Sequence, residues 1–354
     1  MRVSLKLNLI ISILILFVIL ISFTIYSLTP KQVLNYVSET QDLTRKQSNS
    51  EISLTFAGDV MLGRLVGHRH QEGQFVDLIE NFDTKIFEKA DIAWVNLEGP
   101  ISNMKIKQNL SPDNLNFLFS RQAINALKNL HINLVGLANN HTFNSGSNGL
   151  KTTQEFLDKN GINWHGLPTK IDEESVYRFS KEDINLSLIA VHTLYDGSAL
   201  GIDNIIRSEK EKGFFVIVLP HWGEEYQTTH SVKQEGYAKH WADAGADIII
   251  GTHPHVVQDS QIIKGDNDKN TLVFYSLGNF IFDQTFSEET QLGLILKMNL
   301  NSQKLVSIEL VPIESVDLKP QYASVDRTRM IIERVCENIQ SYCDLDNTTI
   351  QIQF

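Results

Sequence analysis

Side chains that bind divalent metals follow several apolar segments of this sequence, at the point where each segment ends. The segment "IIIGTHPHVVQ" (248–258) carries an apolar run into His253 and His255, which flank Pro254. Carboxylates, an amide and a further histidine come after four other apolar runs. The candidate ligands are Asp59, Glu98, Asn140, His221, His253 and His255. Carboxylate, imidazole and amide donors without thiolates suit Mn, Fe or Zn, so this pattern predicts a site for divalent metal ions.

Two ions are the arrangement that this donor set favours. Metals about 3.5 to 4 Å apart can stabilise both the attacking and the leaving oxygen of a phosphoester. Each residue alone has a plainer interpretation, because Asp59, Glu98 and Asn140 could serve turns and His141 and His221 could simply pack. These plainer interpretations would all have to hold at once, at corresponding strand ends, and we therefore favour the metal site.

The elements that must position these residues are short strands alternating with helices. Strands are predicted at 52–57, 92–97, 132–138, 184–191, 214–220 and 247–252, and helices at 121–130, 149–160 and 232–245. Strands that are apolar on both faces indicate an α/β fold whose sheet is covered on both sides. In such a sheet the carboxyl ends of the strands share one edge, where ligands bind, so the polar clusters should converge. Arg64 and Glu225 stand near them in the sequence.

The pattern changes toward strands after residue 271. Runs at 272–282, 292–300 and 305–313 have strand character, with a hairpin turning at "NSQK", and one helix candidate follows near 327–340. We expect these strands to add to the same domain, 51–315, followed by a C-terminal extension with a helix, 316–354.

The N-terminal segment is expected to anchor the protein in the cell membrane. Residues 7–29 contain no charged side chain, and such a stretch is long enough to cross a hydrocarbon core of about 30 Å. Arg2 and Lys6 precede it, which favours a cytoplasmic N-terminus and an extracytoplasmic remainder. No small-residue cleavage site follows, so we predict an uncleaved, single-pass signal anchor at 1–30 and a polar spacer at 31–50.

Composition and charge limit the number of domains and the kinds of partner that the protein can have. The 354 residues are 42% hydrophobic and 21% charged, enough for one large domain or two modest ones. A net charge of -11 argues against nucleic acid as a partner, since phosphate backbones are bound by clustered basic residues. The two cysteines, Cys336 and Cys343, could form a short-loop disulfide in an oxidising compartment.

Six motifs carry a resemblance to a known family. The motifs are "GDVMLGR", "VNLEGP", "ANNHTFNSG", "HWGEEY", "GTHPHVVQ" and "YSLGNFIFDQ", in this order between residues 58 and 284. Together they resemble the CapA-type capsule and poly-γ-glutamate biosynthesis proteins, a family similar to the calcineurin-like metallophosphoesterases. The resemblance implies a four-layer α/β/β/α sandwich of metallophosphoesterase type with a dinuclear metal site.

The resemblance also implies roles for individual residues. Asp59 and His255 would bind one metal, Glu98 would take the position of the bridging acid, and Asn140, His221 and His253 would surround the second metal. His141 would stand near the leaving group as a candidate general acid. Arg64 would clamp an anionic substrate. Asn279 would support the site from its far side.

Two positions depart from the metallophosphoesterase pattern. Met61 stands where the D-x-H motif has histidine, so phosphatase chemistry does not follow from the motif alone. Asn144 stands where many relatives have aspartate, which removes a charge from a supporting contact.

Three classes of function are therefore compared. The first is an extracytoplasmic metal-dependent hydrolase that acts on a phosphoester. The second is a non-catalytic component of a capsule synthesis complex, which would bind an anionic polymer beside capsule synthase subunits. The third, an amidohydrolase barrel, is disfavoured because its HxH follows the first strand, whereas "HPH" here comes after four other site segments.

Overall fold

The computed structural model describes residues 51–350, except positions 105, 108, 112, 113, 196, 198, 267, 302, 303 and 347, and gives only the backbone path of 304–306. Residues Ser50–Phe354 form one compact unit. The predicted signal anchor at 1–30 and the spacer at 31–50 lie outside the described residues. Among the residues that are described, no helix has the length and apolarity needed to cross a bilayer.

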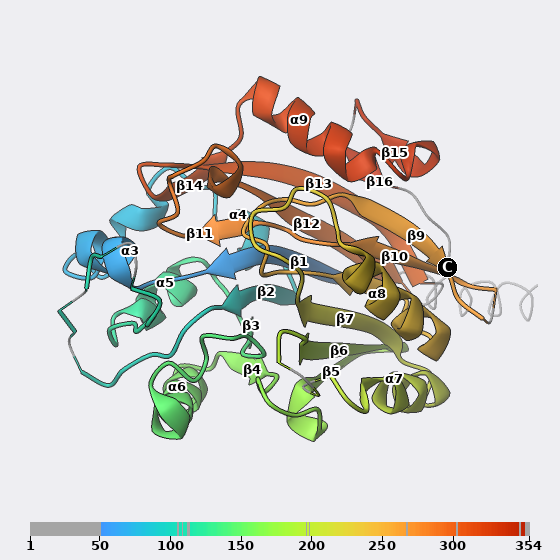
Figure 1. Ribbon diagram of the computed structural model, residues 1–354, viewed down its shortest axis with the longest axis horizontal. Helices are drawn as coiled ribbons and strands as arrows, with labels where there is room; N and C mark the ends of the chain where they lie inside the picture. The colour runs from blue at the N-terminus through green and yellow to red at the C-terminus, as the bar shows by residue number, and fades with distance from the viewer. Residues whose placement is uncertain are drawn as a thin grey trace, which may run out of the picture. The chain divides into compact units, whose positions relative to one another are not determined.

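The larger sheet has ten strands and is mixed (Figure 1). Its main path runs through β15 (Cys343–Asp344), β16 (Thr349–Ile350), β13 (Lys304–Val316), β12 (Leu292–Asn301), β1 (Glu51–Val60), β2 (Ile92–Leu97), β3 (Leu134–Gly136) and β4 (Asn163–His165). The strands from β1 to β4 are parallel, whereas β12 and β13 form an antiparallel hairpin against β1. Two further strands, β11 (Asn279–Ile281) and β14 (Lys319–Tyr322), pair with β1 and β13.

The smaller sheet has six strands. Its order is β5 (Val176–Lys181), β6 (Ile184–His192), β7 (Phe215–His221), β8 (Ile248–Ile250), β10 (Asn270–Phe274) and β9 (Ser260–Lys264). The four central strands are parallel, and the two edge strands are antiparallel to their neighbours. Both sheets therefore collect the carboxyl ends of their parallel strands at one edge.

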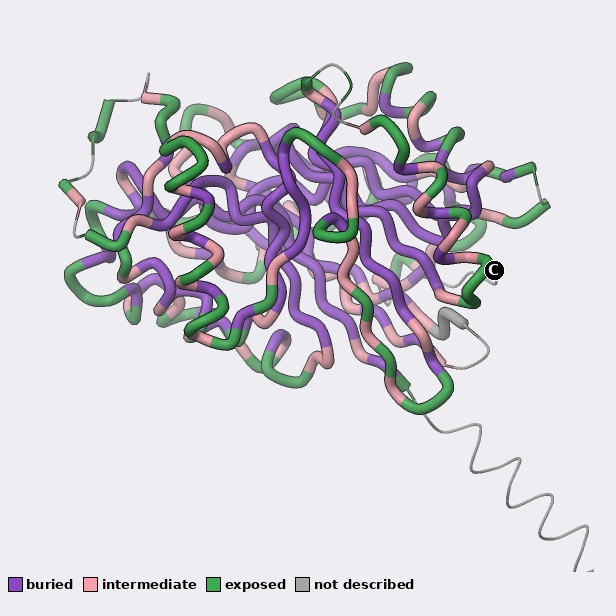
Figure 2. The backbone as a smooth tube through the Cα atoms, turned by 90° about the horizontal axis from the view of Figure 1, so that it is seen from below, coloured by how far each residue is buried: buried purple, intermediate pink, exposed green. Residues whose placement is uncertain are grey.

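Side-chain alternation along the strands divides the apolar residues among three packed clusters. Leu54 and Phe56 of the larger sheet pack with Leu186 and Ile217 of the smaller sheet, so the two sheets face each other. The alternate residues of each sheet pack outward against helices. The buried stretches follow the strands of both sheets in Figure 2, and the exposed stretches lie mainly at the connections.

All but the last of the described α-helices pack on the outer faces of the two sheets, and the last one packs into the cluster between them. The α-helices are α3 (Arg64–His70), α4 (Lys85–Glu88), α5 (Ala123–Asn129), α6 (Gly146–Lys159), α7 (Ile202–Glu211), α8 (Val232–Ala244) and α9 (Val325–Cys336). Short 3-10 turns occupy η1 (Asp77–Ile79), η2 (Glu173–Ser175), η3 (Glu289–Gln291) and η4 (Gln340–Tyr342). Residues of α5 and α6 join the outer cluster of the larger sheet, and residues of α7 and α8 join that of the smaller one. The predicted mixed α/β fold is confirmed, and the two open sheets rule out an amidohydrolase barrel.

One predicted strand is wrong. The run 272–282 is not continuous, because β10 ends at Phe274 in the smaller sheet and β11 begins at Asn279 in the larger sheet. Gly278, between them, has a φ of +68°, and its carbonyl accepts a hydrogen bond from Asp59 N at 3.0 Å. A positive φ is accessible to glycine without a steric cost, and it turns the chain from one sheet to the other.

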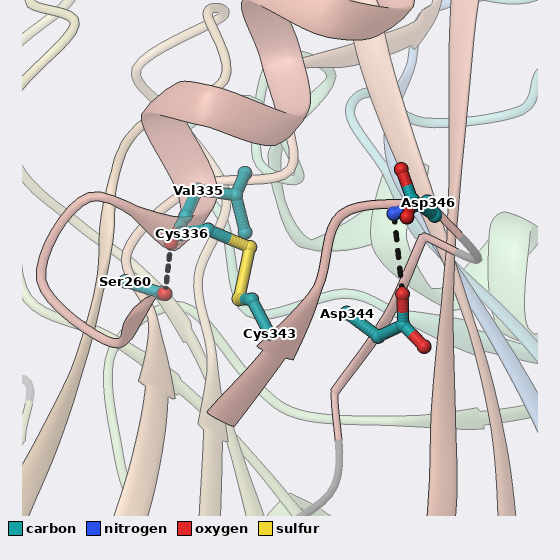
Figure 3. Close-up of a disulfide and its surroundings, with 6 residues drawn as sticks. All are labelled: Ser260, Val335, Cys336, Cys343, Asp344 and Asp346. Carbon is teal, nitrogen blue, oxygen red and sulfur yellow. Dashed lines mark hydrogen bonds between the residues drawn. A yellow bond between two sulfur atoms is a disulfide. The ribbon is translucent and has the colours of Figure 1, made fainter. Parts of the chain in front are cut away.

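The predicted disulfide between Cys336 and Cys343 is confirmed (Figure 3). It ties the end of α9 to β15, and Val335 packs into the cluster between the sheets beside it. Ser260 Oγ donates to the carbonyl of Val335, which links α9 to β9. The C-terminal segment is thereby held against both sheets.

Reduction of this disulfide is expected to lower the free energy of unfolding by about 2 to 3 kcal/mol, the entropy of closing so short a loop in the unfolded chain. The measurement is urea unfolding with and without reductant, with Cys336→Ser plus Cys343→Ser as the genetic equivalent. Equal midpoints under both conditions would contradict the expectation.

The ion pairs of Glu209, in α7, should make the stability of the protein depend on pH. Its buried carboxylate accepts hydrogen bonds from Arg178 at 2.7 and 2.8 Å and from Lys212 at 2.7 Å. Hydrogen bonding from Arg178 is the main cause that lowers the pKa of Glu209 to about 2. A carboxyl whose pKa is lowered on folding stabilises the protein above its unfolded pKa of about 4.3, and this contribution is lost as the pH falls toward 2.

Glu209→Gln should therefore lower the free energy of unfolding by about 1 to 2 kcal/mol at pH 7. Solvent screens this ion pair in part, because Arg178 and Lys212 are partly exposed. The difference from the wild type should shrink between pH 4 and pH 2. Urea unfolding at several pH values measures it, with Glu211→Gln on the exposed face of the same helix as the control. A pH-independent difference would argue against the ion pair as its cause.

Candidate metal centre

The candidate ligands come from the carboxyl ends of strands in both sheets. Asp59 lies at the end of β1 and Glu98 directly follows β2 in the larger sheet, while His221 ends β7 in the smaller sheet. His253 and His255 follow β8. All five are buried. The two sheets face each other, so their strand ends can contribute to one site.

Two groups of three side chains have the geometry to hold a metal ion. One consists of Asp59, Glu98 and His255, and the other of Glu225, His253 and His255; in each group the ligand atoms lie within 4.8 Å of one another. His255 belongs to both groups. Its Nδ1 lies 3.3 Å from Asp59 Oδ2, and its Nε2 lies 3.6 Å from Glu98 Oε1.

Two asparagines that the sequence did not single out as site residues orient the carboxylates. Asn96 Nδ2 donates to Asp59 Oδ1 at 2.7 Å and to Glu98 Oε2 at 3.4 Å. Asn139 Nδ2 in turn donates to Asn96 Oδ1 at 3.0 Å. A polar amide inside the apolar run 92–97 was the available signal for Asn96, and the position of Asn139 directly after the run 132–138 was the signal for Asn139.

A further part of the site, on the side of the smaller sheet, consists of His221, Asn140 and His253. His221 Nε2 lies 2.9 Å from Asn140 Oδ1, and the rings of His221 and His253 are 4.7 Å apart. His192 ends β6 opposite His221 in the strand register, with the two rings 6.1 Å apart. His192 was not among the site residues predicted from the sequence. Its position directly after the apolar run 184–191 was the feature that could have indicated it.

His141 presents one ring nitrogen to the acids. Its Nε2 lies 3.8 Å from Glu98 Oε1, and its ring stacks on Phe117 at 4.0 Å. Asn144 Nδ2 lies 2.8 Å from the carbonyl of Leu115 and 3.1 Å from His141 Nδ1. The carbonyl can only accept, so Nδ2 is the donor there and His141 Nδ1 accepts. The neutral ring therefore carries its proton on Nε2, toward Glu98.

Arg64 is engaged with an acid in this structure. Its guanidinium forms an ion pair with Asp283, and Leu65 N donates to the same carboxylate at 3.0 Å. The guanidinium carbon lies 4.8 Å from the centre of the Phe117 ring. Asp283 falls within the motif "YSLGNFIFDQ" but was not singled out. The contacts with Asp283 hold the guanidinium of Arg64 beside the Phe117 ring, which stacks on His141. This positioning role is in addition to the substrate contact that the resemblance implies.

Burial and mutual charge shift the pKa values of the site. Burial, with Asp59 and Glu225 nearby, raises the pKa of Glu98 well above its usual range. Burial acts to lower the pKa of His255, but Glu98 and Asp59 outweigh it and raise this pKa to about 9. Burial and then the neighbouring histidines lower the pKa of His221 and His253 well below the usual value. Burial and His255 lower that of His141 to about 4.

The donor set fits a divalent cation. Glu98 Oε1 and His253 Nδ1 are buried, and neither has a hydrogen-bond partner among the described residues. Such atoms are costly inside a protein unless something binds them, and both belong to the metal-binding groups above. Carboxylate oxygens and neutral imidazoles are suitable ligands for Mn, Fe and Zn.

Met61, two residues after Asp59 and so at the third position of the motif, is fully buried. Its sulfur accepts a hydrogen bond from Gly63 N at 3.1 Å, and the side chain packs in the outer cluster of the larger sheet. Met61 thus contributes packing at the position where the D-x-H motif has a histidine.

These features define an α/β protein with two facing sheets and a candidate metal centre at the strand ends. A family model described as "Bacterial capsule synthesis protein PGA_cap" matches residues 53–284. The chain belongs to this family, the CapA-type capsule and poly-γ-glutamate biosynthesis proteins.

Two curated relatives carry the CapA name. The chain is 27% identical over 290 residues to the PGA biosynthesis protein CapA of Bacillus subtilis (strain 168), covering 77% of this chain and 74% of the relative. It is 26% identical over 309 residues to the capsule biosynthesis protein CapA of Bacillus anthracis, covering 81% and 73%. A hypothetical protein from Thermus thermophilus, of known crystal structure, shares 16% identity, with a TM-score of 0.47 over 74% of this chain and 99% of that one.

Proposed function

We propose that this protein is a membrane-anchored, extracytoplasmic, metal-dependent hydrolase of metallophosphoesterase type that acts in capsule or poly-γ-glutamate biosynthesis or export. The names of the two Bacillus relatives support the process. The uncharged segment 7–29 supports the anchor. Two facing sheets with helices outside them support a four-layer α/β/β/α sandwich of this type.

One observation carries the hydrolase proposal. His255 is shared by two acid-containing groups whose ligand atoms each lie within 4.8 Å of one another. Asp59, Glu98 and His255 would hold one ion, and Glu98, Asn140, His221 and His253 would hold the second, with Glu225 beside them. When bound, two ions of Mn, Fe or Zn would supply Lewis-acid polarisation of a phosphoryl oxygen and a water of lowered pKa.

The protein's own residues position the ligands and the substrate. Asn96 holds the carboxylates of Asp59 and Glu98 in place. His141 presents Nε2–H toward the site, so it can donate a hydrogen bond to a leaving oxygen. Arg64, braced by Asp283, keeps Phe117 stacked against His141 and adds positive charge near an anionic substrate.

The test uses the full chain in detergent, with phosphodiester and phosphomonoester substrates and added Mn²⁺, Fe²⁺ or Zn²⁺. Turnover should depend on metal, should be lost on chelation, and should fall by more than about 100-fold in His253→Ala, a loss beyond the 10–100-fold typical of residues that only support a ligand. Turnover that survives chelation, or none with any of the three metals, would overturn the proposal.

A second candidate is a non-catalytic, polymer-binding component of a capsule synthesis complex. Met61 favours it, because the site lacks the histidine that metallophosphoesterases place there. Under this function the metal site would bind polymer carboxylates, and capsule synthase subunits would be partners. Metal-dependent binding of poly-γ-glutamate without any turnover would support it. Unchanged capsule after deletion of the gene would count against it.

A further inference from the structure

Three residues outside the ligand groups form a directional series of hydrogen bonds that leads from His255 to the protein surface. The series begins at His255, whose Nδ1 lies 3.0 Å from Asn279 Oδ1. Asn279 Nδ2 lies 2.9 Å from the carbonyl of Thr290 and 3.1 Å from Gln284 Oε1. The Thr290 carbonyl can only accept, so Nδ2 must face it and Oδ1 must face His255. His255 therefore carries a proton on Nδ1, and Nε2 is the ring nitrogen that faces Glu98.

The series continues from Gln284 to the protein surface. Gln284 Oε1 accepts from Asn279, so its amide nitrogen is the donor to Tyr226 Oη, at 3.1 Å. Tyr226 is the sequence neighbour of Glu225, which belongs to the second ligand group. Every bond in the series thus has one possible direction, determined by the Thr290 carbonyl.

Backbone and ring contacts hold Tyr226 against the same histidine. Tyr226 N donates to the carbonyl of Pro254 at 2.8 Å, and its φ of +64° is one that residues other than glycine seldom adopt. Its ring stacks with that of His255, with the centres 6.1 Å apart. The ring of Tyr226 also makes an edge contact with the ring of Phe286, with the centres 5.1 Å apart. Tyr226 is nonetheless 41% exposed, so this series ends at solvent.

We infer that Tyr226 and Gln284 are positioning residues of the metal centre, which hold the amide of Asn279 and, through it, the ring of His255 in place. This inference rests on the proposed metal site. Groups that orient a metal ligand through hydrogen bonds affect affinity by about 10- to 100-fold when they are lost. Neither residue needs to contact the metal for this effect.

The test is isothermal titration of the metal-free full chain in detergent with Mn²⁺ and, in parallel, Zn²⁺. Tyr226→Phe keeps the ring stacking and removes only the hydroxyl, and Gln284→Met removes both amide contacts. Each should weaken binding by about 10- to 100-fold, and the double variant should be no weaker than the weaker single variant, because the bonds act in series. Tyr322→Phe, a partly exposed tyrosine of β14, is the control and should bind as the wild type does.

The outcomes separate the inference from the proposed function. Failure of the wild type to bind either metal would overturn both. Wild-type binding with unchanged affinity in both variants would overturn the inference alone. A weakening that merely follows a loss of melting temperature in the metal-free variants would also overturn it, since a positioning role requires weaker binding at unchanged stability.

Discussion

Purified His255→Ala is expected to lose the ion proposed at Asp59 and Glu98, and so to retain less divalent metal after dialysis than the wild type does. The reason is that His255 is the one imidazole of that group, so its loss leaves the ion with two carboxylates. Its imidazole also lies within 3.6 Å of both Asp59 and Glu98, close enough for the three side chains to share one ion. We expect affinity to fall by more than about 100-fold, beyond the effect of losing a supporting contact.

Metal content by mass spectrometry measures this loss. His240→Ala is the matched control, because His240 lies on the exposed side of α8 and belongs to neither group. An unchanged metal content in His255→Ala would show that the bound metal does not depend on this centre.

Gly58→Ala is expected to be strongly destabilising. A Cβ at this position would lie 1.9 Å from the carbonyl oxygen of Gly278 and 2.9 Å from its carbonyl carbon. Both are backbone atoms of the segment that leads into β11, so no side-chain rotation can relieve the clash. Forcing an atom into so tight a contact should cost about 3 kcal/mol of unfolding free energy.

The same clash should weaken metal binding. Asp59 and Asn279 are register partners in β1 and β11, and moving the strands apart would separate Asn279 from His255. Urea unfolding and metal titration measure the two effects. Gly236→Ala is the control, because a Cβ there would meet nothing within 4 Å on the surface of α8, and it should stabilise the protein by about 1 kcal/mol. Equal stability of the two alanine variants would refute the close approach of β1 and β11.

Local sequence patterns were sufficient for most strands and helices near the site. The strand predicted at 92–97 has the same bounds as β2, and the helix predicted at 232–245 matches α8 to within a residue. Apolar run length and helical spacing are properties of neighbouring residues, so they can be read without knowing the fold. The hairpin at "NSQK" was predicted for the same reason, and β12 and β13 pair there from Asn301 to Lys304.

Contacts between distant residues were harder to predict. Asp283 forms an ion pair with Arg64, which is 219 positions away in the chain. Asn96 contacts His221, which is 125 positions away. No periodicity relates such residues, because their proximity depends on which strands pair and on how the two sheets face each other. The break between β10 and β11 was missed for a related reason, since an apolar run does not reveal that its two ends join different sheets.

The sequence by itself determined the residue types of the centre, their positions at strand ends, the mixed α/β fold, the one possible pairing of its two cysteines and the family resemblance. The tertiary structure decided which of those side chains meet, that Met61 packs away from the ligands, and that Arg64 is paired with Asp283. It also decided the proton positions on His141 and His255. Those depend on the carbonyls of Leu115 and Thr290, backbone acceptors that any residue type supplies and that only the folded chain brings into place.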